Sequence, residues 1–444
     1  MEEQFIAHIS DSGKVQSVAE HSLNTAAAAA DFSIAELRQI NYLCGLLHDV
    51  GKYSSEFQRR IRGENIRVEH SICGALEAAK LEGKGTPLTL LLQLCIAGHH
   101  SGIPDCGVKN NTPDMPTLFG RLRRNPGDFG GYSSELDIER VAPEPFTALL
   151  IKDCKTTADV VEKFAFFVRY CFSCLTDADS LDTAKFCEEA LPEPLRCSFE
   201  RCEASLDAKL GGFKAMTELQ TARSRLQEQA FARIGTDANI YLMNMPTGSG
   251  KTLASMRCAL KRVLASNGRL RRIIYVIPYN SIIDQTALTF EGLFSEHTDV
   301  LRQQSSFVYE EQSELSEDSK AAFSAACENW DAGIVITTAV QFFESLYGDK
   351  RGKLRKVHNM ANSVIVLDEA HLMPREYLEP CLRGIGYITK YLNSQALFLT
   401  ATMPDFRSLL ERCAEGGLSV TDLIDDTSDF EKFRKCRFSD LGKM

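Results

Sequence analysis

The octapeptide Met245–Thr252 constrains the fold of this chain more than any other stretch of its sequence. It reads Met-Pro-Thr-Gly-Ser-Gly-Lys-Thr and directly follows the short apolar run Ile240–Asn244. Glycines allow backbone N–H groups to face a bound phosphate, and the N-terminus of a following helix adds a favourable dipole. Because such a loop works only between a strand and a helix, the sequence predicts a strand at 240–244 and a helix directly after the loop.

Four further apolar runs follow along the chain, and segments of helical periodicity separate them. They are Ile273–Ile277, Gly333–Thr337, Ser363–Leu367 and Ala396–Leu399. Alternating strands and helices are typical of a mostly parallel, doubly wound sheet whose strands are buried on both faces. We therefore expect residues 216–430 to form an α/β domain.

The loop is expected to bind a nucleotide. Lys251 would reach the β- and γ-phosphates, and Thr252 would ligate Mg²⁺. Asp368 and Glu369 stand at the end of a predicted strand, where an aspartate can coordinate Mg²⁺ and a glutamate can polarise the attacking water. The expected binding residues are Pro246, Thr247, Gly248, Ser249, Gly250, Lys251, Thr252, Asp368 and Glu369, of which Glu369 is also catalytic.

Three of these motifs resemble those of a known enzyme class. The loop lacks the first glycine of the general phosphate-loop pattern, and its form resembles motif I of superfamily 2 helicases. Asp368-Glu369-Ala370-His371 resembles the DEAH motif, and Thr400-Ala401-Thr402 resembles motif III. The resemblance implies a RecA-like lobe with ATP and Mg²⁺ as cofactors.

Other matches concern nucleic acid and the adenine base. Ile277–Ser281 resembles motif Ia and Thr337–Gln341 resembles motif Ib, and both follow strands, where backbone N–H groups can hold phosphates. The run 350–356 is rich in Lys and Arg, which favours either a solvated face or contact with a DNA strand. The region Gln220–Arg223 is a candidate for recognition of the adenine.

Residues 1–205 show a different pattern, because apolar residues recur at helical spacing and strand-like alternation is scarce. Helices are expected at Ile34–Leu47, Ser71–Lys80, Pro87–Ile96 and Thr157–Leu175. The sequence thus predicts a multidomain protein, with an all-α domain at 1–205, a connector at 206–215, the α/β domain at 216–430 and a tail at 431–444.

Histidines gather in the all-α region. Imidazole and carboxylate are ligands that suit divalent transition metals. A carboxylate such as Asp49 can also bridge two ions about 3.5–4 Å apart, an arrangement that clamps a phosphoryl group during in-line attack. The candidate ligands are His21, His48, Asp49, His70, His99, His100 and Asp179, most of them at predicted helix ends. Asp177 is an alternative to Asp179, and His8 is left unassigned.

The order of these residues resembles the HD superfamily of metal-dependent phosphohydrolases, and more closely the HD nuclease domain of CRISPR-associated helicase–nucleases of type I systems. The matching stretches are Glu20-His21, His48–Lys52, Glu69–Ser71, His99–Gly102 and Ala178-Asp179. The resemblance implies that one ion is held by His21, His48, Asp49 and Asp179, and the other by Asp49, His70, His99 and His100. Asp49 and Lys52 would be catalytic, with Lys52 assisting the phosphate or the attacking water. The metal is left open among iron, manganese, nickel and cobalt.

An HD site ahead of a DEAH-type lobe resembles these helicase–nucleases over essentially the whole chain. The resemblance implies ATP-driven translocation on DNA and cleavage of single-stranded DNA in antiviral defence, with recruitment by an RNA-guided surveillance complex. The family's second helicase lobe is not found, so we expect an incomplete ATPase and a possible separate polypeptide that carries that lobe. The alternatives are an HD nucleotide phosphohydrolase regulated by an ATPase lobe, and a non-catalytic recruitment fragment.

Composition sets the remaining limits. The formal net charge of −10 excludes a global basic field, so contact with nucleic acid would need a local basic groove. The 15 cysteines are odd in number, and an acidic N-terminus replaces the basic start of a signal peptide. The longest apolar run, Leu88–Ala97, is too short to span a bilayer. We therefore expect a reduced, cytoplasmic protein with no membrane partner.

Overall fold

The computed structural model describes residues 4–83, 85–188, 191–213, 215–304, 308–312, 315–402, 405–413 and 417–434, without the side chains of 280–282, 310, 412 and 413. The chain divides into two compact units. The first unit comprises Met1–Glu193 and Glu344–Asn359, and the second comprises Pro194–Phe343 and Met360–Met444. Most of the predicted tail, residues 435–444, lies outside the described residues.

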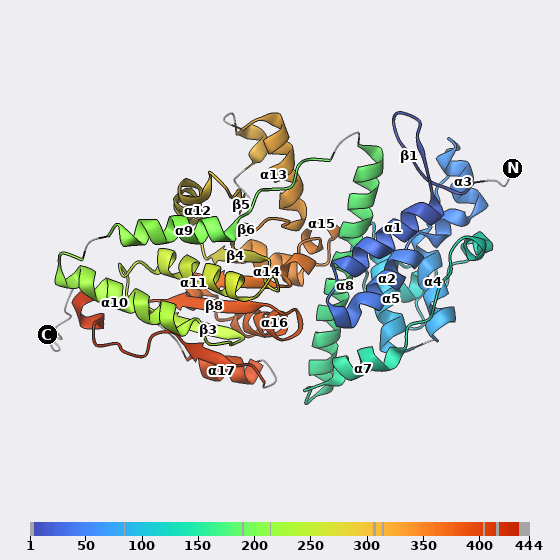
Figure 1. Cartoon of the computed structure of the whole chain (residues 1–444). Helices are drawn as coiled ribbons and strands as arrows, with labels where there is room; N and C mark the ends of the chain where they lie inside the picture. The colour runs from blue at the N-terminus through green and yellow to red at the C-terminus, as the bar shows by residue number, and fades with distance from the viewer. Residues whose placement is uncertain are drawn as a thin grey trace, which may run out of the picture. The chain divides into compact units, whose positions relative to one another are not determined.

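Helices build the first unit, as predicted (Figure 1). They are α1 (Val18–Asp31), α2 (Arg38–Leu47), α3 (Ser55–Ile61), α4 (Ser71–Glu82), α5 (Pro87–Gly98), α6 (Leu118–Arg121), α7 (Pro143–Ile151), α8 (Thr157–Cys187) and α15 (Arg351–Leu354). A short antiparallel hairpin, β1 (Ile6–Ile9) with β2 (Val15–Ser17), precedes them. The all-α prediction missed this hairpin because its strands are too short to show alternation.

The long helix α8 is fixed at its start by a capping box. Thr156 accepts a hydrogen bond from the Asp159 backbone N–H, and the Asp159 side chain accepts one from the Thr156 backbone N–H. Two of the four free N–H groups of the helix start are thereby satisfied. The helix then runs for 31 residues and carries both Asp177 and Asp179.

Glycines allow the helices of the first unit to approach closely. A Cβ at Gly45 of α2 would lie 2.4 Å from the Ala26 Cα of α1. A Cβ at Gly74 of α4 would lie 1.9 Å from the carbonyl oxygen of Leu47. These contacts place the ends of α2 and α4, which carry candidate ligands, next to each other.

The second unit holds a seven-stranded sheet in the order β5-β6-β4-β7-β8-β3-β9, and all its strand pairs are parallel. The predicted α/β class is confirmed. The strands are β3 (Ile240–Asn244), β4 (Arg272–Ile277), β5 (Val300–Gln303), β6 (Ile334–Thr338), β7 (Ser363–Leu367), β8 (Gln395–Thr400) and β9 (Val420–Asp422). The helices are α9 (Phe199–Gly211), α10 (Glu218–Arg233), α11 (Lys251–Ala265), α12 (Asn280–Phe294), α13 (Glu317–Asn329), α14 (Ala339–Tyr347), α16 (Leu378–Tyr391) and α17 (Phe406–Cys413).

Helices cover both faces of this sheet (Figure 1). One face packs Tyr241, Ile273 and Val366 into a core with residues of α9 to α12. The alternate residues of the strands face the other side of the sheet. There the rings of Phe398 in β8 and Phe406 in α17 pack against each other, with their centroids 5.4 Å apart. Because side chains alternate along a strand, both sets are apolar, which is why the sequence showed continuous apolar runs.

The five predicted strands are all present, and of the strands that the structure describes in this sheet, the sequence analysis missed the two at the edges. β5 reads Val-Leu-Arg-Gln and β9 reads Val-Thr-Asp, so neither has the apolar run that marks a central strand. An edge strand pairs on one side only and tolerates polar residues.

The domain boundaries differ from those expected from the sequence. The first unit ends at Glu193 and takes in a later segment, Glu344–Asn359, that we expected within the α/β domain. The difference arises because residues of this segment bond to α8: His358 N–H donates to Ser173 Oγ at 3.0 Å. The chain therefore enters the first unit twice.

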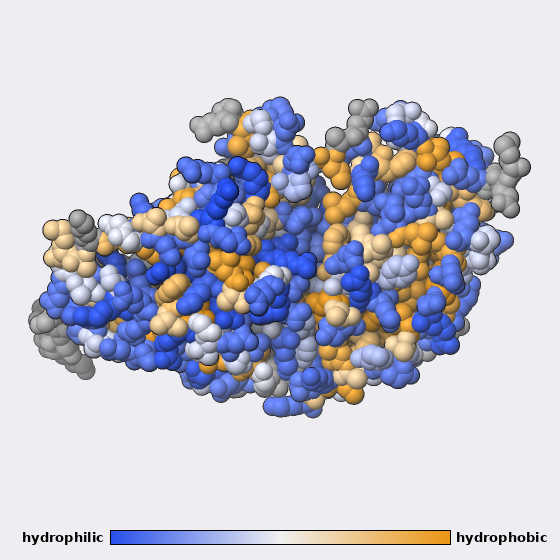
Figure 2. Space-filling model, in the orientation of Figure 1, coloured by the Kyte–Doolittle hydropathy of each residue, from blue (hydrophilic) through white to orange (hydrophobic). Residues whose placement is uncertain are grey.

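The surface shows no sign of a membrane span among the described residues, since none of their helices is long and apolar enough to cross a bilayer. Figure 2 shows that hydrophobic residues on one face of the molecule lie in separate small groups among hydrophilic ones. Scattered apolar residues of this kind are ordinary on a globular protein.

Gly45→Ala is expected to destabilise the protein by about 1–3 kcal/mol, because an added methyl group must separate α1 from α2. The measurement is the free energy of unfolding from urea titration of the first unit's transition. Gly352→Ala is the matched control in the same unit, since nothing lies within 4 Å of its missing Cβ. Equal effects of the two substitutions would contradict the close-approach argument.

Candidate metal centre and nucleotide site

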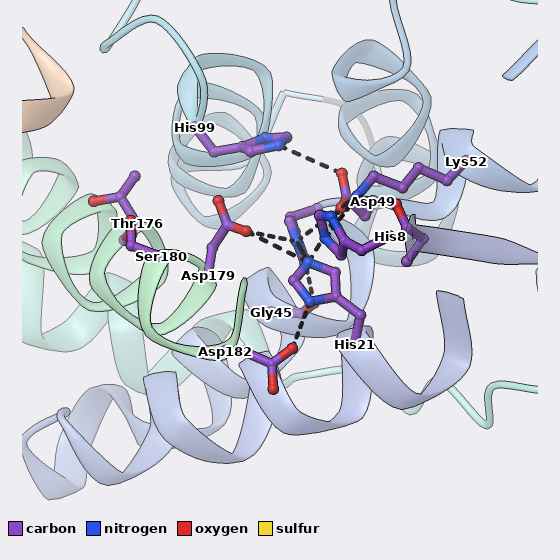
Figure 3. A network of polar contacts seen from close by, with 12 residues as sticks. His8, His21, Gly45, Asp49, Lys52, His99, Thr176, Asp179, Ser180 and Asp182 are labelled. Carbon is purple, nitrogen blue, oxygen red and sulfur yellow. Dashed lines mark hydrogen bonds and ion pairs between the residues drawn. The ribbon is translucent and has the colours of Figure 1, made fainter. Parts of the chain in front are cut away.

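The candidate metal ligands come from five helices of the first unit. His21 lies in α1, His48 and Asp49 follow α2, His70 precedes α4, and His99-His100 follow α5. Asp179 lies in α8. All seven except His100 are buried. The ends of α2, α4 and α5 thus converge on one place, and Figure 3 shows His21, Asp49, His99 and Asp179 directed toward one another.

One group consists of His21, His48 and Asp179, whose ligand atoms lie within 4.8 Å of one another. The Nε2 atoms of the two histidines are 3.2 Å apart. His48 Nδ1 lies 2.7 Å from the carbonyl oxygen of Gly45, and a carbonyl only accepts, so Nδ1 carries the proton and Nε2 is left with a lone pair. Asp179 Oδ1 lies 3.4 Å from His21 Nε2. These atoms together form an electron-rich pocket that suits a cation.

The second group consists of Asp49, His70, His99 and His100, again within 4.8 Å. His70 Nε2 and His100 Nε2 are 2.7 Å apart. His99 Nδ1 lies 2.7 Å from the Ile96 carbonyl oxygen, so its Nε2 also has a free lone pair directed inward. That Nε2 atom is buried and has no hydrogen-bond partner among the described residues.

Asp49 connects the two groups. Its Oδ2 lies 3.4 Å from His21 Nε2 and 3.3 Å from His48 Nε2, while its Oδ1 lies 3.3 Å from His70 Nε2 and 3.5 Å from His99 Nε2. Both oxygens are buried. Oδ2 is paired with the Lys52 ammonium at 2.7 Å, whereas Oδ1 has no hydrogen-bond partner among the described residues. A buried carboxylate oxygen without such a partner is costly, and a divalent cation beside it would compensate for it. The donor set therefore fits two metal ions bridged by one carboxylate.

The charges around the centre point the same way. Burial lowers the pKa of His21, but the carboxylates of Asp179, Asp182 and Asp49 outweigh it and raise that pKa to about 10. Burial raises the pKa of Asp49, but His48 and Lys52 outweigh it and hold the pKa of that carboxyl well below its ordinary value. The surroundings thus favour additional positive charge, which a metal ion supplies.

Two residues of the centre were missed or left unassigned in the sequence. Asp182 Oδ2 lies 2.7 Å from His21 Nδ1 and orients that imidazole, as carboxylates often do behind metal-ligating histidines. Its position three residues after Asp179 on α8 was the available signal, since residues at this spacing share a helix face. His8 of β1 lies with His21 and Asp49 in a third group within 4.8 Å, which only the hairpin brings about.

The two aspartates of α8 have separate partners. Asp179 faces the histidines, whereas Asp177 is paired with Arg355 at 2.8 Å. Successive helical residues are about 100° apart, so residues two positions apart point in nearly opposite directions. The geometry thus favours Asp179 over Asp177 as the ligand.

Lys52 lies beside the bridging carboxylate, with its Nζ 2.7 Å from Asp49 Oδ2 and 3.2 Å from His8 Nε2. It lines a pocket of about 700 Å³ that opens over the second group, together with His70 and His100. Arg60, Arg67 and Arg121 also line this pocket. Glu69 also lines the pocket and pairs with Arg121 at 2.7 Å, so Lys52, Arg60 and Arg67 supply the excess positive charge. An excess of cations at an opening next to candidate metal ligands favours an anionic substrate such as a phosphodiester.

The nucleotide loop of the second unit has the predicted strand–loop–helix geometry. It joins β3 to α11, and Gly248 and Gly250 adopt φ values of 87° and 85° that favour glycine. Lys251 Nζ donates to Glu369 Oε1 at 2.7 Å, so the loop and the DEAH residues meet. Ser249 and Lys251 are buried, while Thr247 and Gly248 are exposed and Pro246 and Thr252 are half-buried. Burial, aided by Glu369, raises the pKa of Asp368 to about 6.

Helix α10 contacts the loop through its side chains. Arg223, within the predicted region Gln220–Arg223, donates to the Gly248 carbonyl at 3.0 Å, and Gln227, outside that region, donates to the Ser249 carbonyl at 2.8 Å. Gln220 takes part in the capping box at the start of α10. Recognition of the adenine by this region stays a prediction. Thr400 Oγ1 lies 2.7 Å from His371 Nδ1, which links the DEAH residues to Thr400–Thr402.

Two family models match separate stretches of the chain. Residues 18–119 match the family model of the HD domain, and residues 224–409 match that of the DEAD/DEAH box helicases. The chain is 25% identical to the CRISPR-associated nuclease/helicase Cas3 of Haloferax volcanii, over 89% of its own length and 49% of that relative. It thus spans about half the length of this relative.

Solved structures show the same fold. The match to the crystal structure of T. fusca Cas3-ATP covers 93% of this chain and 51% of the Cas3 chain, with a TM-score of 0.59 at 17% sequence identity. That of T. fusca Cas3-AMPPNP matches 93% and 52%, with a TM-score of 0.58 at 17% identity. One fold therefore accounts for both units.

The protein is expected to bind two transition-metal ions per chain, and Asp179→Asn is expected to remove one of them, because the first group loses its carboxylate. Asp177→Asn is the matched control two residues away on the same helix and should keep both ions. Elemental analysis after dialysis against Mn²⁺ measures the content. Loss of metal in Asp177→Asn with retention in Asp179→Asn would reverse the assignment.

Proposed function

We propose that this chain, in which an HD domain precedes a DEAD/DEAH box helicase domain, is the nuclease and first helicase lobe of a CRISPR-associated nuclease/helicase. Its HD domain cleaves single-stranded DNA, and its helicase lobe uses ATP to move the strand. The observation that carries this proposal is the pair of histidine groups around the buried carboxylate of Asp49. The similarity to a relative named as a CRISPR-associated nuclease/helicase supports it.

The HD residues would act on a phosphodiester in separate roles. His21, His48 and Asp179 would hold one divalent ion, His70, His99 and His100 the other, and Asp49 both. Ions held in this way supply a hydroxide-like nucleophile at neutral pH and neutralise charge on the phosphate. Lys52, which lies beside Asp49 and lines the pocket, would bind a phosphate oxygen. Asp182 would keep His21 in the tautomer whose Nε2 faces the ion.

The helicase lobe would bind ATP through residues 246–252 and the DEAH aspartate. Lys251 is held by Glu369 in this structure and would turn to the β- and γ-phosphates, which frees Glu369 to orient the attacking water. Asp368 would hold the Mg²⁺ ion. The DNA strand would run along residues 277–281 and 337–341, which lie at the carboxyl ends of the neighbouring β-strands β4 and β6. Of the basic run, Arg351 and Arg355 pair with acids of α8, which leaves less of it for DNA.

The partners follow from the same similarity. An RNA-guided CRISPR surveillance complex would deliver the displaced single strand. A second RecA-like lobe, on further chain or on a separate polypeptide, would complete the ATPase, because superfamily 2 helicases close two lobes around ATP. The coverage of only about half of the relative is consistent with such a lobe.

Asp49→Ala is expected to abolish cleavage of circular single-stranded DNA in the presence of Mn²⁺ and to leave ATP binding unchanged, because it removes the shared ligand of both ions. Lys251→Ala is expected to abolish ATP binding and to leave DNA cleavage unchanged, since the HD residues do not depend on the nucleotide loop. Nicking is followed on gels, and ATP binding with a fluorescent analogue. Cleavage of free deoxynucleotides in place of DNA would favour a nucleotide phosphohydrolase, and loss of both activities in either variant would contradict the separation.

The 444-residue chain alone is expected to hydrolyse ATP very slowly, with or without DNA. An arginine finger contributes about 10³–10⁵ in rate, and in this superfamily the second lobe supplies it. A polypeptide carrying a second lobe should restore DNA-stimulated turnover, as measured by phosphate release. Rapid DNA-stimulated hydrolysis by the chain alone would contradict this expectation and would direct attention to Arg223, which lies against the loop.

A further inference from the structure

The segment Glu344–Asn359 is part of the first unit although its sequence neighbours belong to the second. The Ile103 N–H donates to the Asp349 carbonyl at 2.8 Å. The ring of His358 stacks on Phe32 at 4.9 Å. A Cβ at Gly102 would lie 2.5 Å from the same Asp349 carbonyl oxygen, so glycine is needed for this approach. The segment is therefore firmly packed where it meets the HD helices.

Two arginines of this segment face the two aspartates of α8. Arg351 Nη2 lies 3.1 Å from Asp179 Oδ2, and Arg355 Nη2 lies 2.8 Å from Asp177 Oδ1. Both aspartate side chains are buried, with exposed fractions of 7% and 1%. The two pairs have the same chemistry and join the same two elements. Of the two aspartates, only Asp179 belongs to a candidate metal group.

The two oxygens of Asp179 have different partners. Oδ1 lies 3.4 Å from His21 Nε2, within the first metal group. Oδ2 accepts from Arg351, whose Nη2 atom is also 2.6 Å from Ser180 Oγ. Ser180 Oγ in turn donates to the Thr176 carbonyl, one helical turn back (Figure 3). One nitrogen of the guanidinium thus contacts both Asp179 and Ser180, and it occupies Oδ2 while Oδ1 lies toward His21 and His48.

We propose that Arg351 is a positioning residue of the metal centre, which holds Asp179 so that only Oδ1 is offered to the ion. This inference rests on the proposed function, since it requires an ion between His21, His48 and Asp179. Catalytic metal sites keep a coordination position open for water or substrate. A carboxylate that is free to turn can instead bind a divalent ion with both oxygens and occupy that position.

Loss of Arg351 would raise the affinity for the metal ion in two ways. Asp179 gains a second oxygen for the ion, and a positive charge close to the ion disappears. Both effects tighten metal binding. The first also fills the open position, so turnover falls while affinity rises. A residue that only stabilised the packing of the segment would lower both quantities together.

The test compares Arg351→Gln with Arg355→Gln in the full chain. In Arg351→Gln we expect Mn²⁺ to bind about tenfold more tightly, because a positive charge close to the ion is lost. We expect kcat for cleavage of single-stranded DNA to fall by about 10–100-fold, with little change in KM. In Arg355→Gln we expect Mn²⁺ affinity within about twofold of the wild type and a lower melting temperature, because this variant removes the arginine partner of Asp177 but touches no candidate ligand. Mn²⁺ affinity is measured by electron paramagnetic resonance of the free ion, independently of activity.

Each outcome decides the proposal. Tighter binding with slower turnover in Arg351→Gln alone supports it, and partial recovery of turnover in Arg351→Lys, which keeps the charge, supports it further. Equal or weaker Mn²⁺ binding in Arg351→Gln overturns it and assigns Arg351 to packing. Failure of the wild type to bind Mn²⁺ at a site that Asp49→Ala removes would overturn the proposed metal centre itself, and this inference with it.

Discussion

The buried carboxylate of Asp49 is the constraint on which the first unit depends. Its two oxygens face two different sets of imidazole nitrogens at 3.3–3.5 Å, and the ammonium of Lys52 pairs with Oδ2 at 2.7 Å. Burying an ion costs several kcal/mol unless opposite charge compensates it. Helices α1, α2, α4, α5 and α8 all contribute groups to this one place, so the helical core and the metal centre are built by the same contacts.

The histidines around Asp49 are prepared for ligation by backbone geometry. Backbone carbonyls one turn back, in α2 and α5, accept hydrogen bonds from Nδ1–H of His48 and His99. The Asp182 carboxylate orients the imidazole of His21. Each imidazole therefore presents Nε2 to the interior. The Gly45 and Ile96 carbonyls lie three residues before the histidines they contact, so the tautomers of His48 and His99 are fixed locally. The orientation of His21 depends instead on the packing of α1 against α8, which carries Asp182.

In the second unit, a parallel sheet brings the functional stretches together. Its strands all end at one edge, where the nucleotide loop, the DEAH residues and Thr400–Thr402 follow β3, β7 and β8. The ion pair between Lys251 and Glu369 shows that these separate stretches meet in space. The segment Glu344–Asn359 belongs to the first unit although it follows the nucleotide loop in the sequence. The first unit is therefore complete only when this later part of the chain is present.

The sequence by itself determined the helical first region, the five central strands, the nucleotide loop and the set of candidate ligands, because each depends on local periodicity or on residues adjacent in the chain. It did not determine the β1–β2 hairpin with His8, the contact of Gln227 with the Ser249 carbonyl, or the assignment of Glu344–Asn359 to the first unit. Those features depend on contacts between residues far apart in the sequence. The pairing of Arg351 with Asp179 spans 172 positions, and no local pattern marks one arginine of a basic run for a buried carboxylate. Only tertiary packing brings the two together.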